Sequence, residues 1–314
     1  MWRESVNGAL RRLTGHELRR SGAEESGPAV VASLTAELDR TNARLERTRQ
    51  RLKETRARLE RTRTRLRKAE ARSRKAERRA AQPKPKPTKV MPSHYDENAA
   101  AILRRVEPRT MTDYGKLFAL VEATRYIARS KIPGDIVECG VWRGGSMQAV
   151  ALALLEEGVS DRGLHLFDTF EGMTPPTEKD RREGVPAEEL LASRDKDHRI
   201  WAVAGLDDVQ EAMREVAYPE ELVHFHRGRV EDTVPALAPA RIALLRLDTD
   251  WYESTKHELE HLYDRLVPGG VLIIDDYGDW EGARQATDEF FAGLPEPVLL
   301  IPAGSGRIAV KAGA

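Results

Sequence analysis

Two adjacent carboxylates, Asp275 and Asp276, follow a run of four aliphatic residues that is typical of a buried parallel strand. The preceding predicted strand, 242–247, ends just before Asp248 and Asp250. Because the carboxyl ends of neighbouring parallel strands meet at one edge of a sheet, we expect these side chains to lie close together. Clustered carboxylates repel one another unless a cation neutralises them, and Mg²⁺ prefers oxygen ligands. The spacing therefore predicts a metal site, although Asp is also common where strands pass into loops.

A glycine-containing turn, residues 140–145, separates another apolar strand from the helix that follows it. Glycines allow the backbone to approach a ligand, and a helix N-terminus favours a negative group. The spacing differs from the G-x-G-x-x-G pattern, so a dinucleotide is not favoured. The next strand ends in Asp168, where an acid can accept hydrogen bonds from both ribose hydroxyls. No Walker motif is present, so the pattern favours S-adenosylmethionine (SAM), with its carboxylate at the turn and its ribose on Asp168.

Predicted strands and helices alternate from about residue 95 onwards, and the chain ends in a predicted hairpin. This order predicts an α/β fold with a doubly wound, mostly parallel seven-stranded sheet, Rossmann-like, with an antiparallel edge. The predicted strands are 135–139, 164–168, 222–226, 242–247, 271–274, 298–301 and 307–310. The predicted helices are 114–130, 146–157, 207–217, 254–266 and 283–291.

The composition divides the chain into four segments. Residues 1–33 form an N-terminal segment in which a short amphipathic helix is expected. Residues 34–79 are predicted to form a basic coiled-coil helix. Residues 80–95 are rich in Pro and Lys, which is typical of an extended linker. Residues 96–314 form the globular domain that carries the predicted site.

Leucine recurs at every seventh position of the predicted coiled-coil helix, and Thr or Ala follows each Leu by three residues. This pattern predicts a seam that is only half apolar, through which a homo-oligomer should form weakly. Lys and Arg occupy most outward positions, so peripheral contact with an anionic surface is an alternative. No aromatic residue is interleaved for base stacking, which argues against nucleic acid. The repeated positions are Leu38, Leu45, Leu52, Leu59 and Leu66, followed by Thr41, Thr48, Thr55, Thr62 and Ala69.

The net charge of zero conceals a strong division along the chain. Residues 1–90 hold 26 Lys and Arg against 11 Asp and Glu, and residues 91–314 hold 25 against 40. We therefore expect a basic arm joined to an acidic domain. The single cysteine, Cys139, cannot form a disulfide within the chain, so a reducing, cytoplasmic location is expected. No apolar stretch approaches about 18 residues, which argues against a transmembrane helix.

Four motifs of the globular domain resemble the macrocin O-methyltransferase (TylF/MycF) family over about residues 107–311. They are VECGVWRGGS at 137–146, DTFEGM at 168–173, LDTDWYEST at 247–255 and DDYG at 275–278. The resemblance implies a class I, metal- and SAM-dependent methyltransferase domain over residues 96–314. It does not cover the predicted coiled-coil arm.

The resemblance also implies individual roles. Residues of the first turn would hold the methionine half of SAM, Asp168 the ribose, and residues after the third strand the adenine. Asp248 would serve both as a metal ligand and as the proton acceptor. The more remotely similar catechol O-methyltransferases have a lysine as the base at the position that Trp251 occupies here. The implied cofactor residues are Met111, Glu138, Gly140, Trp142, Ser146, Asp168, Val230, Glu231 and Asp248, and the implied Mg²⁺ ligands are Asp248, Asp275 and Asp276.

The implied reaction is Mg²⁺-dependent methyl transfer from SAM to a hydroxyl, of a sugar on a macrolide-type natural product or of a glycan. A neutral hydroxyl is a poor nucleophile, and a divalent cation lowers its pKa. The arm raises an alternative, an enzyme of a cell-surface polysaccharide that the coiled coil recruits. A non-catalytic SAM-binding scaffold is a further alternative, disfavoured because it needs no clustered carboxylates. A nucleic-acid methyltransferase is disfavoured by the acidic domain.

Other conspicuous residues have structural as well as functional interpretations. His224 and His226 alternate along a predicted strand, which favours structural histidines over ligands. Trp251 and Trp280 flank the carboxylates and either line a sugar site or pack in the core. The polar segment 171–199 is long for a loop without secondary structure, so it is either an active-site lid or a disordered insertion.

Overall fold

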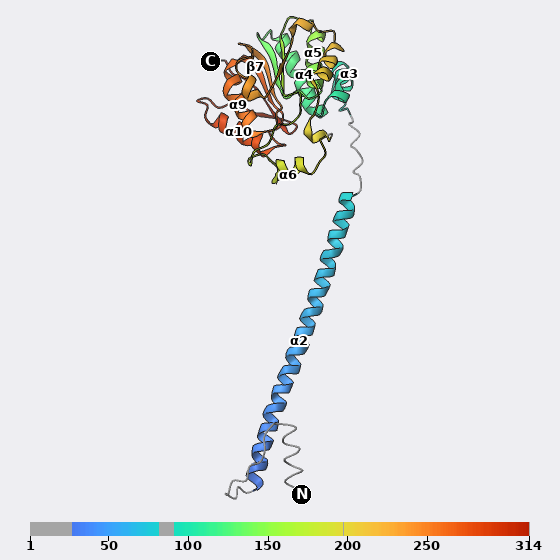
Figure 1. Ribbon diagram of the computed structural model, residues 1–314, viewed down its shortest axis with the longest axis vertical. Coiled ribbons are helices and arrows are strands. Elements are labelled where there is room, and N and C mark those ends of the chain that lie inside the picture. The colour runs from blue at the N-terminus through green and yellow to red at the C-terminus, as the bar shows by residue number, and fades with distance from the viewer. Residues whose placement is uncertain (1–26, 82–90, 197, 314) are drawn as a thin grey trace. The chain divides into compact units, whose positions relative to one another are not determined.

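The protein forms two compact units, Met1–Thr88 and Lys89–Ala314, in a computed structural model that describes residues 27–81, 91–196 and 198–313 (Figure 1). The amphipathic helix expected near the N-terminus and residues 82–90 of the predicted linker lie outside the described residues. No helix in the described part of the chain is both long and apolar enough to cross a membrane.

One long helix, α2 (Gly27–Ala81), makes up the described part of the first unit. It begins seven residues before the predicted position and extends two residues beyond the predicted end. Pro28 lies at the start, where its fixed φ suits a helix and its missing N–H is not needed. No further Gly or Pro interrupts the helix, and Arg, Glu, Leu and Ala favour it throughout.

Seven strands form the main sheet of the second unit, in the order β5-β2-β1-β6-β7-β9-β8. The first five of this order run parallel, whereas β9 runs antiparallel to β7 and β8 antiparallel to β9. The predicted fold class is therefore confirmed. The strands are β1 (Asp135–Cys139), β2 (Leu164–Asp168), β5 (Val223–Arg227), β6 (Ile242–Leu247), β7 (Leu266–Ile274), β8 (Ile301–Ala303) and β9 (Gly306–Val310).

Helices cover both faces of this sheet (Figure 1). Successive side chains of a strand point to opposite faces, so each buried strand supplies two cores. On β1, Ile136 joins the core beneath α4 and α5, and Val137 joins the core beneath α9 and α10. The helices are α3 (Glu97–Val106), α4 (Tyr114–Arg129), α5 (Gly145–Glu156), α7 (Leu206–Arg214), α8 (Val230–Thr233), α9 (Tyr252–Leu262) and α10 (Glu281–Ala292).

The structure differs from the predicted elements at several positions. It contains α3, which the sequence analysis missed and which begins at an N-cap, Asp96, whose side chain accepts a hydrogen bond from the Ala99 backbone N–H. The strand β7 begins five residues earlier than predicted, and β8 begins where the predicted strand 298–301 ends. The segment 171–199 is not structureless, because it contains the hairpin of β3 (Arg181–Arg182) and β4 (Val185–Pro186) and the helix α6 (Ala187–Ala192).

Three histidines pack against one another where β2 meets the edge strand β5. His165 Nδ1 lies 3.1 Å from His226 Nε2, and His165 Nε2 lies 3.3 Å from an Asp135 oxygen. The His224 ring lies 4.7 Å from that of His165. Burial, followed by the charges that His165 and His224 can carry, lowers the pKa of His226 to about 4. The folded protein therefore resists protonation of this half-buried ring.

This arrangement predicts a loss of stability in mild acid. The unfolded chain binds a proton on His226 near pH 6.5, whereas the folded chain does so near 4. The contribution is therefore fully present above about pH 6.5 and lost as the pH falls towards 4. Replacing His226→Gln should reduce the loss by on the order of 1 kcal/mol, measured by thermal unfolding at pH 7 and pH 5. The exposed His94→Gln is the control, and an unchanged pH slope in His226→Gln would contradict the prediction.

Candidate active site

A cavity of about 610 Å³ opens at the carboxyl ends of the parallel strands. Its volume lies in the range of about 300–1,000 Å³ that is usual for small-molecule sites. The lining comes from the turn after β1, the end of β2, the loops after β5, β6 and β7, and the segment that leads into α4. This is the edge at which open α/β sheets bind ligands.

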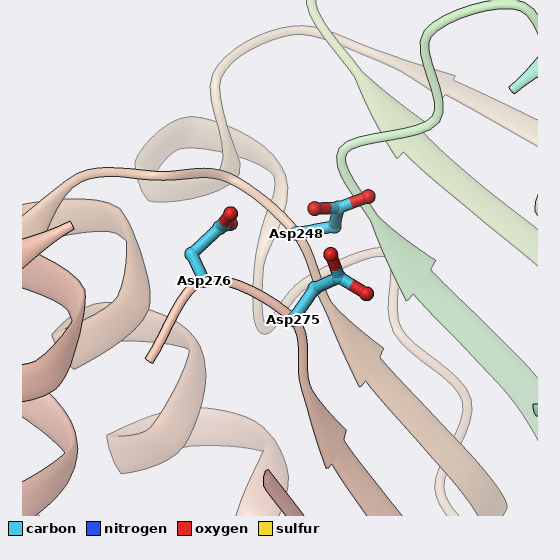
Figure 2. A group of neighbouring side chains, drawn as sticks. All are labelled: Asp248, Asp275 and Asp276. Carbon is cyan, nitrogen blue, oxygen red and sulfur yellow. The ribbon is translucent and has the colours of Figure 1, made fainter. Parts of the chain in front are cut away.

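Asp248, Asp275 and Asp276 meet at this edge, after two neighbouring strands (Figure 2). One oxygen of each lies within 4.8 Å of an oxygen of each of the others. Asp275 and Asp276 are buried, whereas about a quarter of the Asp248 side chain, 24%, is exposed. Asp250 also lines the cavity, and its backbone N–H donates to an Asp276 oxygen at 3.1 Å. The sequence therefore anticipated which carboxylates come together.

Arg246 lies beneath these carboxylates, inside β6, and only 3% of its side chain is exposed. Its Nη1 contacts Glu138 at 2.5 Å and Asp248 at 2.8 Å, and its Nη2 contacts Asp275 at 2.7 Å. Nη2 also donates to Thr112 Oγ1 at 3.1 Å. One guanidinium therefore joins the carboxylates of three neighbouring strands.

Lys116, on α4, supplies a second buried cation. Its Nζ donates to the Asp275 carboxylate, to the Asp275 carbonyl and to Asp279, each at 2.9 Å. Both carboxylate oxygens of Asp275 thus face a cationic side chain. The sequence analysis missed both cations. The available signal for Arg246 was an arginine inside an otherwise aliphatic strand, whereas nothing distinguishes Lys116 from a solvated residue of a helix.

The pKa values of these carboxyl groups diverge. Burial raises the pKa of Asp250 to about 7, and the charge of Asp248 adds to this. Burial also raises the pKa of Asp276, with Asp250 and Asp275 adding to it. For Asp275, burial is outweighed by Arg246 and Lys116, which hold its pKa below the ordinary value. The clustered carboxyl groups therefore tend to retain protons near neutral pH, and a cation that binds beside them would have to displace those protons.

The first turn is built around Asp168, at the end of β2. One carboxylate oxygen accepts from the backbone N–H groups of Val141 at 2.7 Å and Trp142 at 3.0 Å. The other accepts from the Phe170 N–H at 2.7 Å. Because a carboxylate oxygen has two lone pairs, Asp168 retains capacity for about one further hydroxyl. Its predicted bonding to both ribose hydroxyls would require one of these backbone bonds to change.

Gly140 is required at this turn for a reason unrelated to a ligand. Its φ is +84°, and a Cβ built on it would lie 2.0 Å from the Asp248 carbonyl oxygen. A side chain at this position would push apart the loops after β1 and β6. The glycine therefore fixes the distance between the first turn and the first carboxylate of the cluster.

The remaining predicted cofactor residues are distributed around the cavity. Met111, Trp142, Ser146, Val230 and Glu231 all line it. Glu138 does not line it, in contrast to its predicted position, because its side chain is only 1% exposed and bonds to Arg246. Its Oε2 is buried without a hydrogen-bond partner in the described structure, and burial raises its pKa to about 7.

The segment that follows β2 closes the other side of the cavity. Trp251 and Trp280 pack edge to face, with 4.8 Å between their rings, in a small core with residues of α6. The Trp251 indole N–H donates to the Thr174 carbonyl at 2.9 Å, and the Arg182 guanidinium lies 4.3 Å from the Trp280 ring. The two tryptophans line the cavity but are almost fully buried, so they act mainly as packing residues that anchor the segment.

The fold is that of the class I O-methyltransferases. The sequence profile of the macrocin-O-methyltransferase (TylF) family matches residues 34–302, and the chain belongs to this family. The match begins within α2, so it extends further towards the N-terminus than the predicted resemblance over about 107–311.

Several proteins whose names state an activity are similar to more than half of the chain. The chain is 34% identical over 194 residues to the 8-demethyl-8-(2,3-dimethoxy-alpha-L-rhamnosyl)-tetracenomycin-C 4'-O-methyltransferase of Streptomyces olivaceus, covering 60% of this chain and 70% of that one. It is 31% identical over 183 residues to the demethyldecarbamoylnovobiocin O-methyltransferase of Streptomyces niveus, covering 58% and 68%. The solved structure of the O-methyltransferase NovP superposes with a TM-score of 0.58 at 29% identity, covering 65% of this chain and 83% of that one.

The position of Arg246 predicts a specific stability defect. Arg246→Met should leave Glu138, Asp248 and Asp275 without their shared cation, at a cost of about 3–5 kcal/mol in the free energy of unfolding. The defect should shrink at pH 5, since protonation of the carboxylates relieves the repulsion. Urea denaturation at both pH values measures it, and Arg246→Lys, which keeps the charge, is the matched control. A defect that does not depend on pH would show that lost packing, rather than charge, is responsible.

Proposed function

We propose that the protein transfers a methyl group from SAM to a sugar hydroxyl, with Mg²⁺ held by Asp248, Asp275 and Asp276. The observation that carries this proposal is the carboxylate cluster, which lies in the same cavity as the turn around Asp168. A methyl donor and an activated acceptor must meet in line, and a shared cavity allows this.

The cavity suits SAM in charge as well as in position. Trp142 and Ser146 of the first turn line the cavity, where the methionine half of SAM would contact them. Asp168 has capacity for a ribose hydroxyl, while Val230 and Met111 offer apolar surface on the lining. The excess of carboxylates also favours a sulfonium, which carries positive charge. SAM would supply the methyl group as an electrophile.

The carboxylate cluster suits a hard divalent cation, because all its donors are oxygens. Three carboxylates beside Arg246 and Lys116 leave net negative charge that such a cation offsets. Bound there, Mg²⁺ would lower the pKa of the acceptor hydroxyl and orient it. Arg246 and Lys116 would hold Asp275 in place for this role.

Two carboxylates are candidates for taking up the proton that the acceptor hydroxyl loses. Asp248 is the predicted acceptor, but its carboxylate already faces Arg246 at 2.8 Å and belongs to the proposed ligand set. Asp250 lines the same cavity outside that set, so its carboxylate would remain available to accept a proton when the three ligands hold the metal. We therefore propose Asp250 as an alternative proton acceptor, with Asp248 retained as a ligand.

A sugar hydroxyl is proposed as the acceptor because the name of the first relative gives a rhamnosyl tetracenomycin as the substrate of that enzyme. The segment 171–201 would hold the acceptor side of the cavity and exclude water, since Met173, Thr174 and Ile200 contribute to the lining. Exclusion of water strengthens each electrostatic contact inside the cavity.

Asp168→Ala should weaken SAM binding. The loss of hydrogen bonds to a carboxylate is worth about 1.5–3 kcal/mol, or at least tenfold in affinity. Isothermal titration calorimetry with SAM measures this loss. Because Asp168 also shapes the turn, thermal unfolding without SAM must be measured beside it. Asp161→Ala, which removes an exposed carboxylate that does not line the cavity, is the control, and unchanged SAM affinity in Asp168→Ala would contradict the placement.

Removal of the metal, or of a ligand, should separate metal binding from proton transfer. Excess chelator should abolish turnover while SAM still binds. Asp276→Asn should weaken Mg²⁺ binding at least about tenfold, since one oxygen donor loses its charge. If Asp250 is the acceptor, Asp250→Asn should lower kcat by about 10²–10⁴ with Mg²⁺ affinity unchanged.

The turnover of Asp250→Asn decides between the two carboxylates. Asp248→Asn should lose Mg²⁺ affinity as well as turnover, whichever residue accepts the proton. Nearly full kcat in Asp250→Asn would return the role to Asp248. Full turnover in excess chelator would overturn the metal-dependent mechanism itself.

A further inference from the structure

Four leucines of α2 form an apolar stripe that the structure leaves exposed. Leu38, Leu45, Leu52 and Leu59 are each 48–60% exposed, although leucine is usually buried. They recur every seven residues and so occupy the a positions of a heptad repeat, with Thr at the d positions. We call this stripe of a and d positions the seam. Its length and regularity are those of a coiled-coil contact surface.

Three threonine hydroxyls of the seam already have hydrogen-bond partners within α2. The hydroxyls of Thr41, Thr48 and Thr55 donate to the backbone carbonyls four residues earlier, at 2.9, 2.9 and 2.8 Å. Burying a hydroxyl is costly only when it lacks a hydrogen bond. Because these hydroxyls are satisfied within α2, a second helix can cover the seam without leaving them unpaired.

Arginine flanks the seam on both sides. The e and g positions, which border a and d, decide which partner a coiled coil accepts. Seven consecutive e and g positions are arginine, and the acidic residues of the same stretch lie at the outward b and c positions instead. The arginines are Arg44, Arg49, Arg51, Arg56, Arg58, Arg63 and Arg65, and the acidic residues are Glu46, Glu54 and Glu60.

This pattern opposes pairing of α2 with a second copy of itself. In a parallel pair, each g position faces the next e position of the partner, so Arg44 would face Arg49 and Arg51 would face Arg56. In an antiparallel pair, g faces g and e faces e, which again brings arginines together. Glu46 contacts Arg49 at 3.0 Å and Glu60 contacts Arg63 at 3.3 Å. The three glutamates of this stretch are fewer than its seven arginines at e and g positions, so they can offset only part of the charge.

The period of the seam opposes a flat anionic surface. An α-helix has 3.6 residues per turn, so a strict seven-residue repeat drifts by about 20° per heptad. Over the four heptads from Leu38 to Leu66 the stripe therefore turns by about 80° around a straight helix. A membrane surface would contact only part of it, whereas a supercoiling helix follows it along its length. The helix also has no aromatic residue of the kind that anchors interfacial helices.

We propose that α2 forms a coiled coil with a helix of another protein. That partner helix has apolar residues in a heptad repeat and Asp or Glu at its e and g positions. The apolar residues of that helix cover the seam, and its carboxylates pair with the two rows of arginine. Charge complementarity then selects the partner, because opposite charges at these positions favour pairing and like charges disfavour it. The proposal concerns the arm alone and does not depend on the reaction in the cavity.

Two synthetic peptides test this proposal with the full-length protein. Each has five heptads with Leu at a and d, and one has Glu and the other Lys at every e and g position. Fluorescence anisotropy should show that the Glu peptide binds at least tenfold more tightly than the Lys peptide, and that added salt weakens the binding. No binding of the Glu peptide, or equal binding of both, would overturn the proposal.

Matched variants locate the contact on the helix. The seam variant Arg49→Glu, Arg51→Glu, Arg56→Glu should invert the preference in favour of the Lys peptide. The control Arg47→Glu, Lys53→Glu, Arg61→Glu makes the same change in net charge at b and c positions and should retain the original preference. Equal loss in both variants would mean that total charge alone attracts the peptide, and would overturn the proposal.

Two further measurements test whether a second copy of the chain or a membrane surface binds the seam instead. Sedimentation should show that the protein does not self-associate through the seam, so the double variant Leu45→Ser, Leu52→Ser should sediment like the unaltered protein. The same double variant should no longer bind the Glu peptide. Vesicles of phosphatidylcholine and phosphatidylserine should bind the protein less tightly than the Glu peptide does. Tight self-association through the seam, or vesicle binding that exceeds peptide binding and requires the leucines, would each overturn the proposal.

Discussion

The Arg246 guanidinium contacts one carboxylate from each of three adjacent strands or strand ends, within hydrogen-bond distance and almost without solvent. Removing this charge would leave buried anions side by side, a state that proteins avoid because the attraction that offsets their desolvation is gone. Lys116 neutralises one more charge but engages Asp275 again rather than Asp276. The site is thus held together by cations that are too few for its anions. The proposal of a bound metal ion rests on this imbalance.

The sheet fixes where these charges can lie. Glu138 on β1 is directly paired with Arg246 on β6, which in turn pairs with Ile273 on β7. A shift of one residue in either register would turn Arg246 to the other face and separate it from its partners. The loops beyond the strands are fixed as well, because the Asp248 carbonyl fills the space that a side chain on Gly140 would need. The first turn and the carboxylate cluster therefore cannot move independently.

The parts of this structure that sequence predicts best are those that local pattern decides. The aliphatic runs gave β1, β2 and β6 at their observed bounds, and the position of Asp at strand ends anticipated the cluster. Lys116 was not predictable in this way, since it reaches Asp275 across 159 residues. The same holds for Glu138, which was expected at the cavity but lies behind it because Arg246 competes for its carboxylate. Contacts between buried charges depend on strand order, which no local pattern contains.

The globular unit has an excess of carboxylates and α2 an excess of arginines, and the two excesses differ in how they can be neutralised. In the globular unit the carboxylates are enclosed with internal cations, so the imbalance is local and a single small cation can offset it. Along α2 the arginines that flank the seam are exposed from Arg44 to Arg63, and Glu46, Glu54 and Glu60 lie at outward positions. Screening limits each charge to about 8 Å at physiological salt, so only carboxylates that lie against the seam can neutralise them. An acidic helix bound there would also raise the effective concentration of any acceptor that its protein carries, without altering a residue of the cavity.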